Sequence, residues 1–99
     1  MTKNIDNLIL RRAINQWGED AQIDMIIEEC LELALALQSL KRKSKDRQET
    51  LKNVIDEIAD VKIIIEQACI IFPRAEIYAR IDFKMNRLAE RLENKKFNL

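Results

Sequence analysis

Apolar and polar positions divide the 99-residue chain into four amphipathic segments separated by short polar or helix-breaking stretches. The helical period of the apolar positions predicts helices over about residues 5–16, 20–41, 49–71 and 74–94. Gly18 is expected to end the first helix and Asp20 to cap the second. Pro73 is expected to separate the last two. Residues 95–99 are expected to form a frayed tail.

The second predicted helix is apolar on opposite faces. At about 100° per residue, one stripe comprises Ile23, Ile27, Cys30, Ala34 and Leu37, and the other comprises Met25, Leu33, Ala36 and Leu40. A helix with this pattern is expected to be buried between neighbours. Glu29 and Glu32 nevertheless lie on the second face, about 60° apart by helical geometry.

The third predicted helix repeats this arrangement. Its core-like positions are Val54, Ile55, Ile58, Val61, Ile65 and Cys69. Glu57 and Asp60 stand three residues apart and share a face with Val61 and Ile64. Two helices therefore each present a carboxylate pair from an apolar neighbourhood.

Composition favours a small all-α protein. The chain contains one Gly and one Pro, too few breakers for the turns of a β-protein. A chain of this length forms one domain and buries only about 60–65% of its unfolded surface, so self-association is expected. Formal net charge is zero, which does not indicate a nucleic-acid or membrane partner.

The chain has no histidine, which removes the commonest general base and zinc ligand. Cys30 and Cys69 lie in apolar runs and are expected to be buried free thiols. No signal-peptide region or bilayer-spanning run is recognised, so a cytoplasmic location is expected. Any chemistry must therefore rest on carboxylates, amines, guanidiniums and metals.

Burying four unpaired carboxylates costs several kcal/mol for each and adds mutual repulsion. Solvent exposure, pairing with Lys or Arg, or cation binding would each relieve this cost. Oxygen ligands without nitrogen or sulfur suit Mg²⁺, with Mn²⁺ also possible. The competing interpretation is a non-catalytic helical interaction or scaffold module whose acids form a salt-bridge network. A di-iron bundle is disfavoured because that class usually uses Glu-x-x-His.

Glu29-x-x-Glu32, followed after 24 intervening residues by Glu57-x-x-Asp60, resembles the signature of MazG-like all-α nucleoside triphosphate pyrophosphohydrolases. The strings "EECLEL", "DEIADV" and "WGEDAQ" extend the resemblance, which covers residues 17–91. It implies a single domain over 1–99, with its core at about 17–92. It also implies a four-helix MazG-like bundle that hydrolyses (deoxy)nucleoside triphosphates to monophosphate and pyrophosphate. The four acids would then be the ligands of Mg²⁺.

The same resemblance implies further roles. Glu28 would be an outer ligand or a catalytic base that orients the attacking water. Lys84 and Arg87 resemble a KxxR pattern that faces the phosphates, although Asp82 replaces the Asn often found two residues before the Lys. Trp17 is a candidate to stack on a base, or else a staple between the first two helices. A basic run would either steer triphosphate or simply be solvated, and it comprises Lys41, Arg42, Lys43, Lys45 and Arg47.

Four helices of this size have too little interior to cover both faces of the second helix. A second copy is therefore expected to bury some exposed apolar residues, the candidates being Leu31, Leu35, Ile63, Ile70 and Ile71. The resemblance also implies a homodimer or tetramer.

Overall fold

A computed structural model describes residues 5–42 and 46–97. They form four helices and no strand: α1 (Asn7–Trp17), α2 (Glu19–Lys41), α3 (Arg47–Ile71) and α4 (Arg74–Phe97). The all-α prediction is confirmed for these residues. No helix among them is long and apolar enough to cross a membrane.

Side-chain caps and one glycine set the ends of the first three helices. Asp6 caps α1, its Oδ1 accepting from the Leu8 N–H at 2.9 Å. Gly18 ends α1 with φ 90° and donates its N–H to the Ile14 carbonyl at 2.7 Å, as predicted. Gly18 also holds the N-cap position of α2, so the cap predicted at Asp20 is wrong.

Several predicted boundaries differ from the structure by one to three residues, and α1 begins at Asn7 instead of residue 5. α3 begins two residues early because Asp46 Oδ1 accepts from the N–H groups of Gln48 and Glu49, at 3.0 and 3.3 Å. The predicted frayed tail is helical as far as Phe97. Of the predicted basic run, Lys43 and Lys45 lie outside the described residues.

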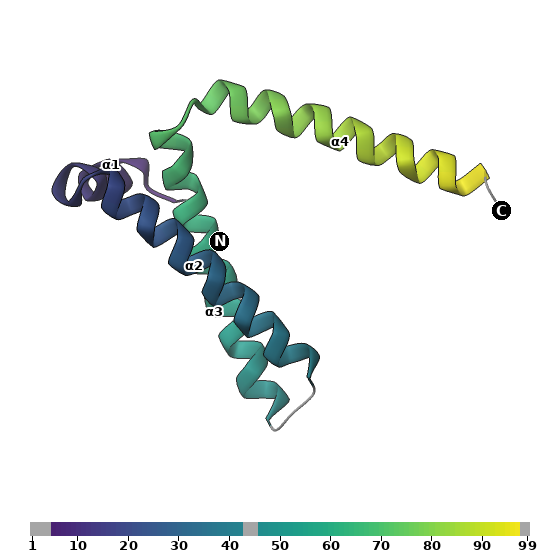
Figure 1. The fold of residues 1–99 in the computed structure, drawn as a ribbon, viewed down its shortest axis with the longest axis horizontal. Coiled ribbons are helices and arrows are strands. Elements are labelled where there is room, and N and C mark those ends of the chain that lie inside the picture. Colours follow the sequence, from purple (N-terminus) through teal and green to yellow (C-terminus); the bar gives the residue numbers. More distant parts are fainter. Residues whose placement is uncertain (1–4, 43–45, 98–99) are drawn as a thin grey trace.

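The helices α2 and α3 form an antiparallel hairpin, and α1 crosses its open end (Figure 1). On α2 all the less exposed positions except Ile23 alternate four and three residues apart, at Gln22, Ile26, Glu29, Leu33, Ala36 and Leu40. On α3 the same spacing joins Thr50, Val54, Glu57, Val61, Ile64, Ala68 and Ile71. This is the spacing of a coiled-coil contact, here called the α2–α3 seam.

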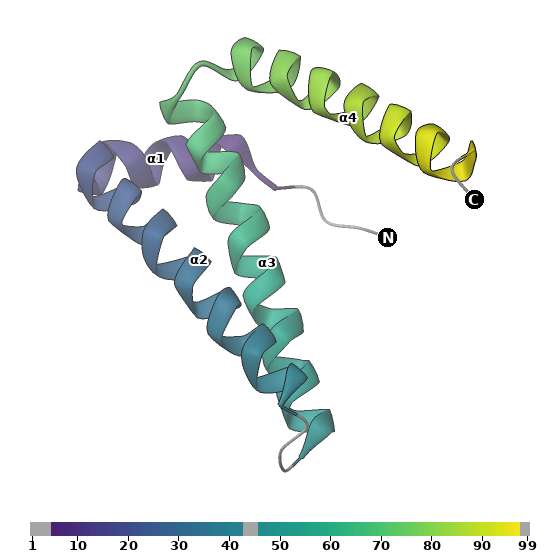
Figure 2. The ribbon, with the colours of Figure 1, turned by 45° about the vertical axis from the view of Figure 1, so that its right-hand side comes forward.

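The helix α4 leaves the hairpin and projects away from it, as both views show (Figure 2). Its contacts are with α3, from which only Phe72 and Pro73 separate it. The predicted four-helix bundle is therefore not formed within the described part of one chain. The chain measures 55 × 42 × 30 Å along its principal axes.

Two predictions of burial fail for a single chain. Cys69 is buried, but Cys30 is exposed. One stripe of α2 faces the seam, whereas most of the other, including Ile27 and Leu37, is exposed because no other described helix covers it. The buried apolar core is small and comprises Leu10, Ala36, Val54, Ile64 and Cys69.

Candidate functional site

Two acids occupy positions of the α2–α3 seam that apolar residues fill elsewhere along it. Glu29 lies between Ile26 and Leu33 in the seam of α2, and Glu57 lies between Val54 and Val61 in that of α3. Both side chains are half-buried. The seam therefore directs two carboxylates towards each other from opposite helices.

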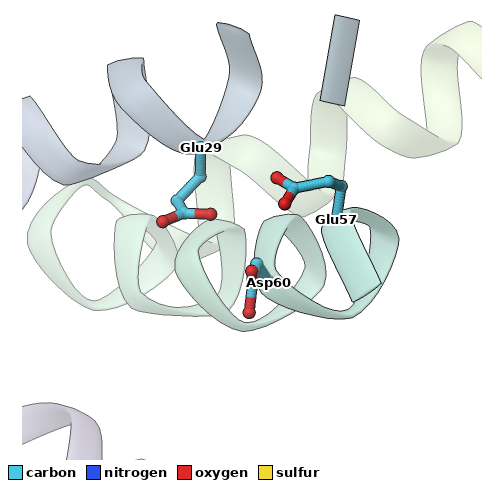
Figure 3. A group of neighbouring side chains, drawn as sticks. All are labelled: Glu29, Glu57 and Asp60. Atoms are coloured by element: carbon cyan, nitrogen blue, oxygen red, sulfur yellow. The ribbon is translucent and has the colours of Figure 1, made fainter. Parts of the chain in front are cut away.

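Glu29, Glu57 and Asp60 form one cluster, in which an oxygen of each carboxylate lies within 4.8 Å of the others (Figure 3). Glu29 points from α2 towards α3, which carries Glu57 and, one turn later, the exposed Asp60. The Oε2 atoms of Glu29 and Glu57 are buried and have no hydrogen-bond partner. A buried polar atom without a hydrogen-bond partner lowers the stability of the folded chain. A hydrogen-bond donor or a cation bound at the site would relieve this cost.

Burial and mutual repulsion raise the pKa values of both seam acids. Burial is the main reason that the pKa of Glu29 lies above its ordinary 4.5, and the charges of Asp60, Glu32 and Glu28 raise it further. Burial likewise raises the pKa of Glu57, and the charge of Glu32 raises it further. The anionic cluster is therefore electrostatically strained.

Glu32 and Glu28 lie beside the cluster and are both exposed. Glu32 borders a hollow of about 230 Å³ between α2 and α3, lined also by Leu35, Ala36, Ser39, Asn53 and Glu57. Of the four predicted metal ligands, the structure thus groups three and places Glu32 at the adjoining hollow. Asn53 and Ser39 were not predicted; the signal for Asn53 is its position four residues before Glu57, one helical turn away.

No basic side chain pairs with the cluster among the described residues. Across these ranges, the sole ion pair joins Arg74 Nη2 to Glu66 Oε1 at 2.6 Å, at the far end of α3. The salt-bridge network expected of a scaffold module is therefore not formed by these residues.

The remaining predicted site residues lie apart from the cluster. Lys84 and Arg87 are exposed on the projecting α4, where the Arg87 guanidinium lies 5.9 Å from the centre of the Phe83 ring. Trp17 is 65% exposed and borders an open hollow with Ala21, Gln22 and Met25. Met25, which lines this hollow, stands one helical turn before Glu29. Both interpretations of Trp17, base stacking and a staple between α1 and α2, therefore stay predictions.

Comparisons with models of known protein families, with curated proteins and with solved structures found no match to this chain.

Proposed function

We propose that this chain is a MazG-like, divalent-metal-dependent hydrolase that converts (deoxy)nucleoside triphosphates to nucleoside monophosphates and pyrophosphate. One observation carries the proposal: carboxylates from two helices converge in an apolar seam, with two buried oxygens unpartnered. A cation is the partner that best relieves both the repulsion and the unpartnered oxygens.

The donor set fits magnesium. Glu29, Glu57 and Asp60 offer oxygen atoms only, which suits a hard cation such as Mg²⁺ or Mn²⁺. Glu32 is placed to join from the adjoining hollow. A metal in this position would neutralise charge on the phosphoryl oxygens and lower the pKa of bound water.

The chain's own residues divide the remaining tasks. Glu28, exposed one residue before Glu29, would orient the attacking water as a base. Trp17 offers an aromatic face on which a base of any kind can stack, in a hollow that extends along α2 as far as Met25. Lys84 and Arg87 supply cations for the triphosphate. Water then cleaves the bond between the α- and β-phosphoryl groups, with no protein nucleophile.

The test is a screen of canonical and modified nucleoside triphosphates for pyrophosphate release with Mg²⁺, Mn²⁺ or EDTA. We expect monophosphate and pyrophosphate in equal amounts, and none in EDTA. Glu57→Gln should abolish turnover. Asp56→Asn is the matched control, because Asp56 is the exposed neighbouring acid, and it should retain the wild-type rate.

Two outcomes would overturn the proposal. One is the absence of turnover for every nucleotide in the presence of metal. The other is release of orthophosphate and a diphosphate, which would place the cleavage at a different bond.

A further inference from the structure

A single chain exposes too much surface to be a complete globule. Its accessible surface is 8562 Å², whereas a compact monomer of 11.7 kDa exposes about 5,900 Å². Its radius of gyration is 17.3 Å, against about 13 Å for a compact chain of this length. A dimer that covered the excess of about 2,700 Å² on each copy would bury about 5,400 Å² in total, at the upper end of the range for obligate protein interfaces.

Much of this excess lies on α4. Every side chain from Tyr78 to Asn94 is exposed. A lengthwise apolar stripe with spacings of four, three and four residues comprises Ile81, Met85, Leu88 and Leu92, which are 45–63% exposed. A basic band runs one residue ahead of this stripe at the same spacing and comprises Arg80, Lys84, Arg87 and Arg91. The arm thus presents an apolar stripe with positive charge along one edge.

The outward face of α2 presents the complementary pattern. Its exposed apolar row comprises Ile27, Leu31 and Leu35, which are 53%, 60% and 62% exposed. An acidic row at the same spacing, beside the apolar row, comprises Asp24, Glu28 and Glu32. Glu32, at one end of this acidic row, lines the hollow together with Glu57 of the carboxylate cluster. A helix with an apolar stripe and a basic edge fits both rows.

At the α3–α4 elbow, one ion pair joins the first residue of α4 to α3. Arg74 Nη2 donates to Glu66 Oε1 at 2.6 Å and to the Tyr78 hydroxyl at 3.2 Å. The Arg74 guanidinium also lies 5.1 Å from the centre of the Tyr78 ring. Phe72 is extended, with φ −105° and ψ 160°. The α4 of the same chain is therefore directed away from the α2 rows that it would fit (Figures 1 and 2).

We propose that α4 is an exchanged arm: in a homodimer, each α4 lies along the outward face of α2 of the other copy. The apolar stripe covers the row Ile27, Leu31 and Leu35, and the basic band follows the acidic row. Lys84 and Arg87 from one copy then stand beside the carboxylate cluster of the other. This step rests on the proposed function. It means that the phosphate site of each copy is completed by Lys84 and Arg87 of the other copy and is incomplete in a single chain.

Cross-linking between distinguishable chains tests the exchange without any reference to activity. Both chains carry Cys30→Ser, because Cys30 is exposed beside Leu31. One carries Leu31→Cys, and the other, of different mass through a tag, carries Leu88→Cys. After co-expression, a short bismaleimide should join the two into a heterodimer. Ala79→Cys in place of Leu88→Cys is the matched control, because Ala79 lies on the opposite side of α4, and it should not cross-link.

The same two cysteines placed in one chain test whether α4 lies instead on its own hairpin. A single chain carrying both Leu31→Cys and Leu88→Cys should not close on itself. An intramolecular link, or no link in either experiment, would overturn the exchange.

Light scattering adds an independent measurement: wild type should have twice the chain mass, Leu88→Glu should have the mass of one chain, and Ala79→Glu should remain dimeric. A wild-type monomer at about 10 μM would also overturn it.

Complementation between two inactive variants tests whether α4 of one copy completes the phosphate site of the other. Glu57→Gln chains and chains carrying Lys84→Ala with Arg87→Ala should each be inactive. Co-expressed, they should regain about a quarter of the wild-type rate, because half of the dimers are mixed and each has one intact site. No regain with an active wild type would overturn the shared site. Heterodimer cross-links with an inactive wild type would leave the exchange standing and refute the proposed function.

Discussion

At the scale of single residues, Glu29 and Glu57 make stability depend on pH. Their pKa values are raised above the ordinary 4.5, so between 4.5 and the raised values the folded chain binds more protons than the unfolded chain. The free energy of unfolding therefore falls as pH rises through this window. Urea unfolding in EDTA from pH 4.5 to 7.5 should show wild type losing stability relative to Glu57→Gln. Asp56→Asn should follow wild type. If the difference in the free energy of unfolding between wild type and Glu57→Gln is constant with pH, the electrostatic strain in the cluster is refuted.

The backbone conformation of Gly18 is one that other residues rarely adopt. Its φ of 90° and ψ of 157° lie in a region that is essentially restricted to glycine. A Cβ at this position would meet nothing within 4 Å, so Gly18→Ala tests the backbone alone. We expect a loss of about 1–3 kcal/mol in urea unfolding, and little change for the exposed helical control Gln16→Ala. An unchanged Gly18→Ala would show that the turn relaxes without strain.

The sequence predicts which acids share a face but not how each side chain is placed. Spacing of three residues predicts that Glu29 and Glu32, like Glu57 and Asp60, belong together. It does not reveal that Glu29 is a seam position while Glu32 lies outside it at the hollow, because that depends on the rotation of α2 against α3. Asn53 was missed for the same reason, because it lines a hollow that forms only when α2 and α3 pack together.

At the scale of helices, the α2–α3 seam should respond to metal. A ligand that binds only the folded state at one hundred times its dissociation constant stabilises it by about 2.7 kcal/mol. Mg²⁺ should therefore raise the melting temperature of wild type. Glu57→Leu, which places an apolar side chain at a coiled-coil position, should raise the metal-free melting temperature and abolish the Mg²⁺ response. Asp56→Asn should retain it. A wild-type melting temperature that Mg²⁺ leaves unchanged would contradict metal binding in the seam.

Helix ends were predictable where the chain has a strong local signal, and the placement of α4 was not. Gly18 and Pro73 punctuate the chain, and the helices that they separate begin or end within a residue or two of the prediction. The amphipathic pattern of α4 is the same whether it covers its own hairpin or another copy. What decides between them is the elbow between α3 and α4, where Arg74 of α4 contacts Glu66 of α3.

At the scale of the whole molecule, exposed apolar surface and charge have a joint consequence. α2 carries six acidic residues and one basic residue, whereas basic residues outnumber acidic ones on α4. A hairpin of one sign and an arm of the other attract each other between copies, although the net charge of the chain is zero. Neutral overall composition is thus compatible with a charge-guided interface.

Folding and association should therefore be coupled, and the melting temperature should depend on protein concentration. For a dimer that unfolds to two separate chains, each tenfold rise in concentration favours the folded state by about 1.4 kcal/mol per dimer. Circular dichroism from 1 to 100 μM should show the wild-type melting temperature rising steadily. Leu88→Glu, which places a carboxylate in the apolar stripe of α4, should melt lower and at a temperature independent of concentration, whereas Ala79→Glu should behave as wild type. A concentration-independent wild type would mean that one chain folds alone despite its 8562 Å² of exposed surface.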